Sequence, residues 1–180
     1  RQPMGPVFVY SGFGSQHRKM AKELMARSPL FARRMRELDE MVQFQAGWSM
    51  LEIIENDELT YDTENGQVTI TAIQIAQTDL LAAAGITPAA TMGMSMGEIA
   101  AAYGAGGLSA EECIPVATAR ARLMGEGEAM IAGTEQEGAM AVVELSREEL
   151  AEFVEKHEQA RGVEPAVYAG PGMTTVGGPG

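Results

Sequence analysis

The sequence lacks a second cysteine and any long apolar run, and each absence excludes a class of protein. Cys113 is the only cysteine among 180 residues, so no disulfide can form within the chain and a reducing compartment is favoured. No uncharged apolar run reaches the roughly 18 residues that a membrane span requires. We therefore expect a cytoplasmic protein without a membrane span.

Basic residues are also scarce, and they are unevenly placed. The chain has 13 Lys and Arg against 25 Asp and Glu, and its net charge of −12 argues against nucleic-acid binding, which requires a basic face. Residues 1–36 hold eight of the basic residues, and none occurs between Glu37 and Ala119. The early cluster is either a solvated helix face or a docking surface for an acidic partner.

Apolar periodicity and turn residues predict an α/β fold in which helices flank a parallel sheet. Val7–Tyr10 and Pro88–Met94 have strand patterns, and Asn56–Asn65 is acidic and turn-rich, which indicates a surface loop. Ser109-Ala-Glu-Glu112 is a capping box that opens a helix ending near Met124. The other helical patterns cover 18–27, 30–45, 48–55, 67–84 and 96–103.

The pattern changes after Gly138 and predicts a second, smaller lobe. Ala139–Leu145 alternates like a strand, and Ser146-Arg-Glu-Glu149 is a capping box before a helix to about Gln159. Two short strand patterns follow, at 165–168 and 173–176, and Gly177–Gly180 is interpreted as a turn. We divide the chain into a large α/β lobe, residues 1–137, and the start of an α+β lobe, residues 138–180, which we expect to be truncated.

Gly93-Met94-Ser95-Met96-Gly97 matches the G-x-S-x-G nucleophile elbow of α/β-hydrolase-like folds. In such an elbow a tight strand-to-helix turn projects the serine hydroxyl, and glycines on both sides allow the turn to close. The helix that follows points its N–H groups at a developing oxyanion. The pentapeptide alone is weak evidence, but here a strand pattern precedes it and a helix pattern follows. Ser95 is therefore the candidate nucleophile.

The general base is harder to find. His157 lies on a polar helix face, and His17 could approach Ser95 only through tertiary packing. No Asp or Glu near His17 in sequence marks an orienting partner. We expect the base to lie beyond Gly180, with His17 as the alternative.

Four segments of the chain carry recognisable motifs, and they are Phe8–Gln16 (the G-x-G-[SA]-Q loop), Gln67–Ala76 (Q-P-x-x-x-A-x-Q-x-A), Gly93–Ser109 (G-H-S-x-G-E, then A-A-x-x-A-G-x-L-S) and Arg120–Met124 (R-x-x-x-M). In this order they resemble the malonyl/acyl-CoA:acyl-carrier-protein transacylases and the acyltransferase domains of polyketide synthases. The sequences of Tyr10–Met20 and Leu123–Met130 are especially similar to the acyltransferase of mycolic-acid-condensing polyketide synthases. Residues 139–180 resemble the start of the family's ferredoxin-like small lobe.

The resemblance implies a role for each matched residue. Ser95 would take an acyl group from a coenzyme A thioester and pass it to the phosphopantetheine thiol of an acyl carrier protein. The N–H groups of Gln16 and Met96 would form the oxyanion hole, and Gln67 would line the pocket. Arg120 would hold the free carboxylate of a malonyl-type substrate. The resemblance also implies flanking synthase domains, and no cofactor or metal bound by this domain itself.

Departures from the family pattern fall close to the predicted site. Met94 replaces the usual histidine before the serine, which would change the shape and polarity of the substrate pocket. Val68 stands where proline is common, and Ala169 where the small lobe usually has asparagine. The family's catalytic histidine would fall beyond Gly180.

The substrate and two rival functions remain open at this point. Met96 favours malonyl or an unusual carboxyacyl group, because the family has glutamine there for methyl-branched units. Met92, Met94 and Met96 either form a soft cluster for a long-chain 2-carboxyacyl group or simply pack the core. A serine hydrolase or thioesterase would share the elbow. A catalytically degenerate docking domain would explain Met94 and the missing base.

Overall fold

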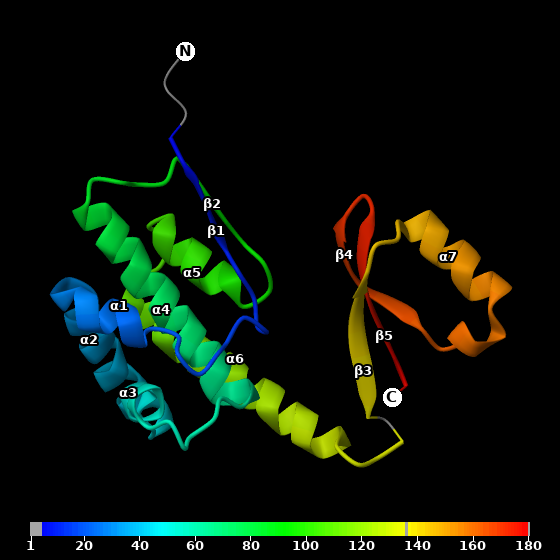
Figure 1. The fold of residues 1–180 in the computed structure, drawn as a ribbon, viewed down its shortest axis with the longest axis horizontal. Helices are drawn as coiled ribbons and strands as arrows, with labels where there is room; N and C mark the ends of the chain where they lie inside the picture. Colours follow the sequence, from blue (N-terminus) through cyan, green and yellow to red (C-terminus); the bar gives the residue numbers. More distant parts are fainter. Residues whose placement is uncertain (1–4, 136, 180) are drawn as a thin grey trace. The chain divides into compact units, whose positions relative to one another are not determined.

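A computed structural model describes residues 5–135 and 137–179, and the chain divides into two compact units between Glu126 and Gly127 (Figure 1). Helix α6 runs across this boundary. The first unit contains β1 (Val7–Tyr10), α1 (Lys22–Arg27), α2 (Pro29–Ala46), α3 (Met50–Glu55), α4 (Thr63–Ala83), β2 (Ala90–Gly93), α5 (Gly97–Gly104) and most of α6 (Ala110–Ile131). The second contains β3 (Gly138–Val143), α7 (Arg147–Lys156), the 3-10 turn η1 (Glu158–Ala160), β4 (Glu164–Gly170) and β5 (Met173–Pro179).

The predicted parallel sheet is confirmed, and it brings two loops together. Strands β1 and β2 pair in parallel, so that Tyr10 lies opposite Gly93 at the end of both strands. The Met94 N–H donates a 3.0 Å hydrogen bond to the Tyr10 carbonyl just past these ends. The segments that begin at Ser11 and at Met94 therefore leave the sheet side by side, with α5 packed against both strands.

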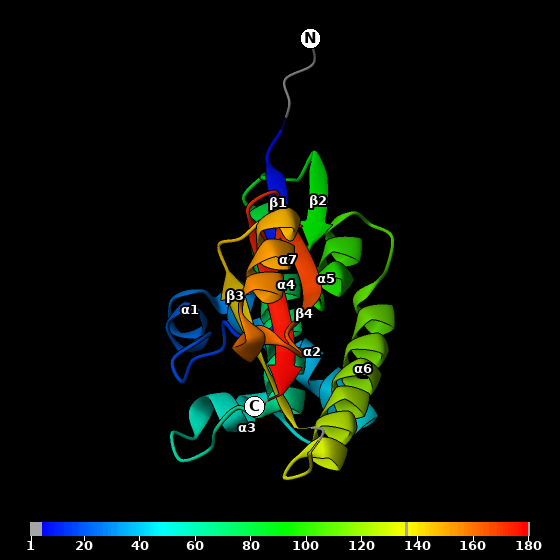
Figure 2. The ribbon, with the colours of Figure 1, turned by 90° about the vertical axis from the view of Figure 1, so that its right-hand side faces the viewer.

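The core of the first unit lies among α2, α3, α4 and α6, which Figure 2 shows from a second side. Leu38 of α2 and Ile114 of α6 are fully buried there. Cys113 is part of the same core, as the sequence indicated. Within the described residues, no helix combines the length and the apolar content needed to cross a membrane.

Several helix boundaries differ from the sequence prediction: α1 begins at Lys22 rather than at 18, and α7 ends at Lys156 rather than near Gln159. Two further differences have a local reason. The predicted loop at Asn56–Asn65 is wrong at its end, because α4 already begins at Thr63. Asp62 and Asn65 form a reciprocal capping box that satisfies the first N–H groups of the helix. Helix α6 extends past Met124 to Ile131 despite its glycines. Arg122 and Glu126, one helical turn apart, form a 2.8 Å ion pair. This pair links residues on either side of Met124, where the helix was predicted to end.

The second unit is a three-stranded antiparallel sheet with one helix. Its strand order is β3-β5-β4, and α7 begins at the predicted capping box of Ser146 and Glu149. The turn predicted at Gly177–Gly180 is wrong for the described residues, because β5 continues to Pro179. Gly177 pairs with Met140, and Gly178 pairs with Ala139. Gly180 lies outside the described residues.

Candidate active site

The turn between β2 and α5 places Ser95 in a left-handed backbone conformation, with φ of 54°. This conformation is strained for a residue with a side chain and is common at functional turns. Both glycines of the motif are required, because a side chain at either position would clash with the neighbouring backbone. A Cβ on Gly97 would lie 2.3 Å from the Tyr10 carbonyl oxygen, and one on Gly93 would lie 2.3 Å from the Gly97 backbone. The elbow therefore closes only because neither position carries a side chain.

Arg120 and Gln67 lie at the serine, as the resemblance implied. The Arg120 guanidinium, from α6, donates a 3.2 Å hydrogen bond to Ser95 Oγ. It also donates a 2.7 Å bond to Oε1 of Gln67 on α4. Gln67 is 2% exposed, so it holds the guanidinium from a rigid position. A fixed positive charge beside the hydroxyl favours negative charge on that oxygen and on a carboxylate bound nearby.

The glycine-bearing loop after β1 packs between the elbow and α4. A Cβ on Gly12 would lie 3.0 Å from the Met94 carbonyl oxygen and 3.5 Å from Ser95 Cβ. At the other end of the loop, Gln16 Oε1 accepts a 2.8 Å hydrogen bond from the Gly14 N–H. Within the described part of the chain, the N–H groups of Gln16 and Met96 donate no hydrogen bond. Their role in an oxyanion hole stays a prediction.

The three methionines around the elbow do not form one cluster. The Met96 side chain is buried with Met20 and Ile70. Met92 and Met94, by contrast, are each 57% exposed. The core-packing interpretation therefore holds for Met96, whereas Met94 presents an apolar side chain to solvent next to Ser95 in the chain.

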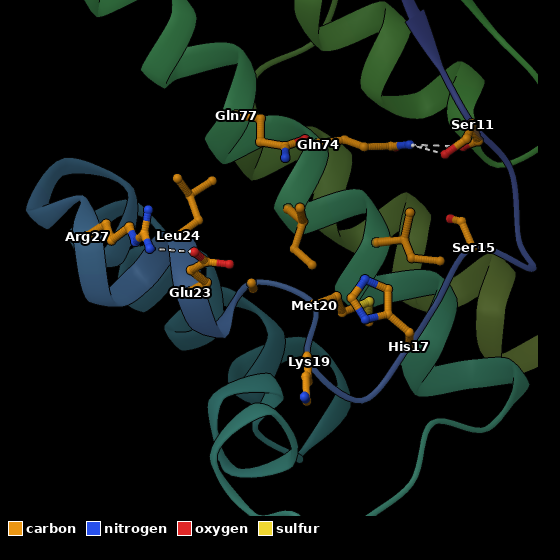
Figure 3. A pocket seen from close by; sticks show the side chains of 13 residues that line it. Ser11, Ser15, His17, Lys19, Met20, Glu23, Leu24, Arg27, Gln74 and Gln77 are labelled. Carbon is orange, nitrogen blue, oxygen red and sulfur yellow. Dashed lines mark hydrogen bonds and ion pairs between the residues drawn. The ribbon is translucent and has the colours of Figure 1, made fainter.

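In the described residues, the His17 side chain makes no hydrogen bond to Ser95, whose hydroxyl is bonded to Arg120. His17 is exposed in a cleft of about 530 Å³ that Ser11, Ser15 and Gln74 also line (Figure 3). The residues that line this cleft do not include Ser95, Arg120 or Gln67. His157, in the second unit, stacks on Phe153 at 4.1 Å between ring centroids. The identity of the general base stays a prediction.

Cys113 is no rival nucleophile. Burial raises the pKa of its thiol to about 11, so the reactive thiolate does not form near neutral pH. The side chain packs in the core and its sulfur is 3.6 Å from the Ile99 carbonyl oxygen.

Four of the seven basic residues of the early cluster that the structure describes form ion pairs, among them Arg18 with Asp57. Lys22 contacts Asp57 at 2.5 Å, Arg27 contacts Glu23 at 2.8 Å, and Arg34 contacts Asp79 at 2.7 Å. These pairs favour the interpretation of a solvated helix face, because their charge is already compensated.

Sequence reasoning missed Arg18, which fixes the segment before α4. Its guanidinium donates to the carbonyl oxygens of Ile53, Ile54 and Leu59. It also lies 5.4 Å from the centre of the Tyr61 ring. No local motif signals this role, because the partners lie far along the chain.

The family model of the acyl transferase domain matches residues 7–180. This chain belongs to that family. Its curated relatives include mycobacterial polyketide synthases. A phenolphthiocerol/phthiocerol polyketide synthase of Mycobacterium tuberculosis is 38% identical over 176 residues, which are 97% of this chain and 9% of that protein. A mycocerosic acid synthase-like polyketide synthase of Mycolicibacterium smegmatis is also 38% identical, over 97% of this chain and 8% of that protein. The acyltransferase chain thus spans less than a tenth of either relative.

Solved acyltransferase domains have the same fold. The acyltransferase domain of the polyketide synthase PpsC of Mycobacterium tuberculosis aligns with a TM-score of 0.80 and 35% identity, over 98% of this chain and 50% of that one. A loading acyltransferase from the avermectin modular polyketide synthase aligns with a TM-score of 0.79 and 29% identity, over 97% and 54%. The predicted α/β class agrees with these neighbours.

Proposed function

We propose that this acyltransferase domain loads a carboxyacyl group from coenzyme A, through an ester on Ser95, onto the phosphopantetheine thiol of an acyl carrier protein. The observation that carries the proposal is the contact of Arg120 with both Ser95 Oγ and Gln67. A buried amide that fixes a guanidinium at the nucleophile is what recognition of a carboxylate beside a reacting thioester requires.

The reaction would proceed by two matching transfers. Ser95 Oγ loses its proton to a base and attacks the thioester carbonyl, forming a C–O bond while the C=O electron pair moves onto oxygen. The N–H groups of Gln16 and Met96 stabilise this oxyanion, and each such donor is typically worth a hundredfold or more in rate. The coenzyme A thiolate leaves and takes up a proton. A carrier-protein thiol then attacks the ester and releases Ser95.

The acyl group we propose is malonyl or a longer 2-carboxyacyl chain. Arg120 supplies the cation for the carboxylate, and the exposed Met94 offers apolar surface that adapts to an alkyl chain. Use in mycolic acid or other fatty acid synthesis belongs to this proposal. It is supported by the names of two mycobacterial relatives, a phenolphthiocerol/phthiocerol polyketide synthase and a mycocerosic acid synthase-like polyketide synthase.

The rest of the assembly is proposed on the same basis. Flanking synthase domains are expected, because the relatives are far longer than this chain. The strand order β3-β5-β4 supports a ferredoxin-like small lobe, and the free thiol of Cys113 fits the cytoplasm.

Intact-mass spectrometry tests the proposal. The intact protein is exposed to malonyl-CoA, to a long-chain 2-carboxyacyl-CoA and to its uncarboxylated counterpart, with Ser95→Ala as the control. We expect a covalent adduct from a carboxylated donor that disappears in Ser95→Ala. No adduct from any donor would instead support a degenerate docking domain. Release of free acid without a carrier protein would support a thioesterase.

Arg120→Leu tests the carboxylate assignment, with Arg122→Leu as its matched control. Arg122 is exposed on the same helix and pairs with Glu126 rather than with the site. We expect Arg120→Leu to lower loading of the carboxylated donor by about a hundredfold, the scale of one lost charge-assisted bidentate contact. Equal loading of the carboxylated and uncarboxylated donors by the unaltered protein would remove the assigned role of Arg120.

A further inference from the structure

The carbonyl of Ser11 is the point where β1 turns into the glycine-bearing loop. A Cβ on Gly97 would lie 2.7 Å from the Ser11 carbonyl oxygen, so this oxygen lies against the first residue of α5. Gly12, the next residue, packs on the Met94 carbonyl and on Ser95. The position of the Ser11 peptide therefore sets how the loop approaches the nucleophile.

Gln74 holds this carbonyl from α4. Its Nε2 donates a 2.9 Å hydrogen bond to the Ser11 carbonyl oxygen, and its side chain is only 8% exposed (Figure 3). Among the described residues, no backbone N–H donates to that oxygen. One turn further along α4, Thr78 donates to the Gln74 carbonyl and accepts from the Tyr10 hydroxyl at 2.8 Å. Two successive turns of α4 thus fasten the end of β1.

Burying the Gln74 amide carries a cost in stability. Its Oε1 is buried without a hydrogen-bond partner in the described part of the chain. A buried unpaired oxygen opposes folding and offsets part of what the bond to the Ser11 carbonyl contributes. The role of the amide therefore lies in its Nε2 group, which holds the Ser11 carbonyl oxygen.

We infer that Gln74 is a positioning residue that, through the Ser11 carbonyl, sets the Gly12–Gln16 loop and its oxyanion-binding N–H against Ser95. The inference rests on the proposed function only for its effect on rate, because the placement of the loop can be measured without any reaction. Gln74 does not touch the reacting atoms in this arrangement.

The test compares Gln74→Leu with Gln77→Leu in the intact protein. Gln77 is exposed on the same face of α4 and lines the same cleft, and its side chain makes no hydrogen bond among the described residues. Gln74→Leu is expected to slow acylation of Ser95 about tenfold, the scale of one lost hydrogen bond that aligns a reacting group. Its KM for the acyl-CoA should stay within about twofold, since the substrate contacts are unchanged. Gln77→Leu should leave both constants unchanged.

Gln74→Glu adds a readout that a purely structural role would not move. Burial raises the pKa of a carboxyl group, and the neutral acid can donate to the Ser11 carbonyl whereas the carboxylate cannot. The variant should therefore approach the rate of the unaltered protein as the pH falls from 8 to about 5.5, narrowing a roughly tenfold deficit to about threefold or less.

Hydrogen exchange of the peptide that contains residues 11–16 separates this inference from the proposed function. Faster exchange in Gln74→Leu than in Gln77→Leu supports positioning even if no ester ever forms on Ser95, a result that would remove the proposed function alone. Unchanged exchange of this peptide, or acylation at the rate of the unaltered protein, would overturn the role of Gln74. Faster exchange throughout the first unit would overturn it too, because Gln74 would then be a general structural residue.

Discussion

The two compact units bury very different amounts of their apolar surface. In the first, α2, α4 and α6 enclose a core in which Phe31, Met35 and Leu38 are fully buried. In the second, Leu150 and Val176 are the buried apolar side chains among the described residues, while Met140 and Val142 are exposed. The residues of the proposed site belong to the well-packed unit. Gln67 and Arg120 lie on helices that contribute to this core, and Ser95 lies on the turn between β2 and α5, so the unit can hold the fixed distances that the proposed reaction requires.

We expect the largest loss of stability at a glycine of the first unit that has no room for a side chain. Gly97→Ala would press a Cβ onto the Tyr10 carbonyl, which is 2.3 Å away and cannot move without parting the strands. We expect a loss of more than about 4 kcal/mol, or no folded protein. Gly170→Ala in the second unit, where nothing lies within 4 Å, should change stability by less than about 0.5 kcal/mol. Urea unfolding of the intact protein measures both, and similar losses would contradict the difference in packing.

Truncation of buried leucines compares the two cores directly. Leu38→Ala should cost about 2–5 kcal/mol and increase hydrogen exchange throughout the first unit, because the cavity lies in its continuous core. Leu150→Ala should increase exchange in β3, α7 and β5 and leave the peptides of the first unit protected. Exchange that spreads from Leu150→Ala into α2 and α4 would mean that the units unfold together.

Ionisation of the buried Cys113 thiol makes the stability of the first unit depend on pH. Burial raises the pKa of its thiol from 9.0 to about 11, so the folded state holds the proton more tightly than the unfolded chain. The resulting contribution to stability is complete below pH 9 and is lost as the pH rises towards 11. Cys113→Ala should therefore flatten the fall in stability between pH 9 and 11, measured by urea unfolding. An identical slope would indicate that the core admits water at this position.

We expect the smallest change in stability at Gly127, where the second unit begins. Gly127 lies on the exposed side of α6, and nothing lies within 4 Å of a Cβ built there. Gly127→Ala should raise stability by up to about 1 kcal/mol, because alanine loses less backbone entropy in a helix. A lower melting temperature for this variant would show that α6 does not continue through Gly127.

The sequence allowed the elbow, the parallel strands and both serine capping boxes to be predicted, because each depends on residues close together in the chain. The start of α4 was missed because Asp62 and Asn65 form a capping box from residue types less usual in that motif. The contact of Arg120 with Ser95 spans 25 residues, and only the resemblance to a family suggested it. The Gln74 contact spans 63 residues, and no periodicity distinguishes a buried amide that holds a carbonyl from one that faces solvent.

The left-handed backbone at Ser95 bears on how a domain of this kind could lose its activity. At φ of 54°, a residue with a side chain is held about 1–2 kcal/mol above its relaxed conformation, whereas glycine is not. A lineage in which the hydroxyl no longer mattered would drift towards glycine or asparagine at this turn, since the fold alone prefers them there. The residue at this single position could therefore sort related domains into those still selected for chemistry and those retained only as scaffold.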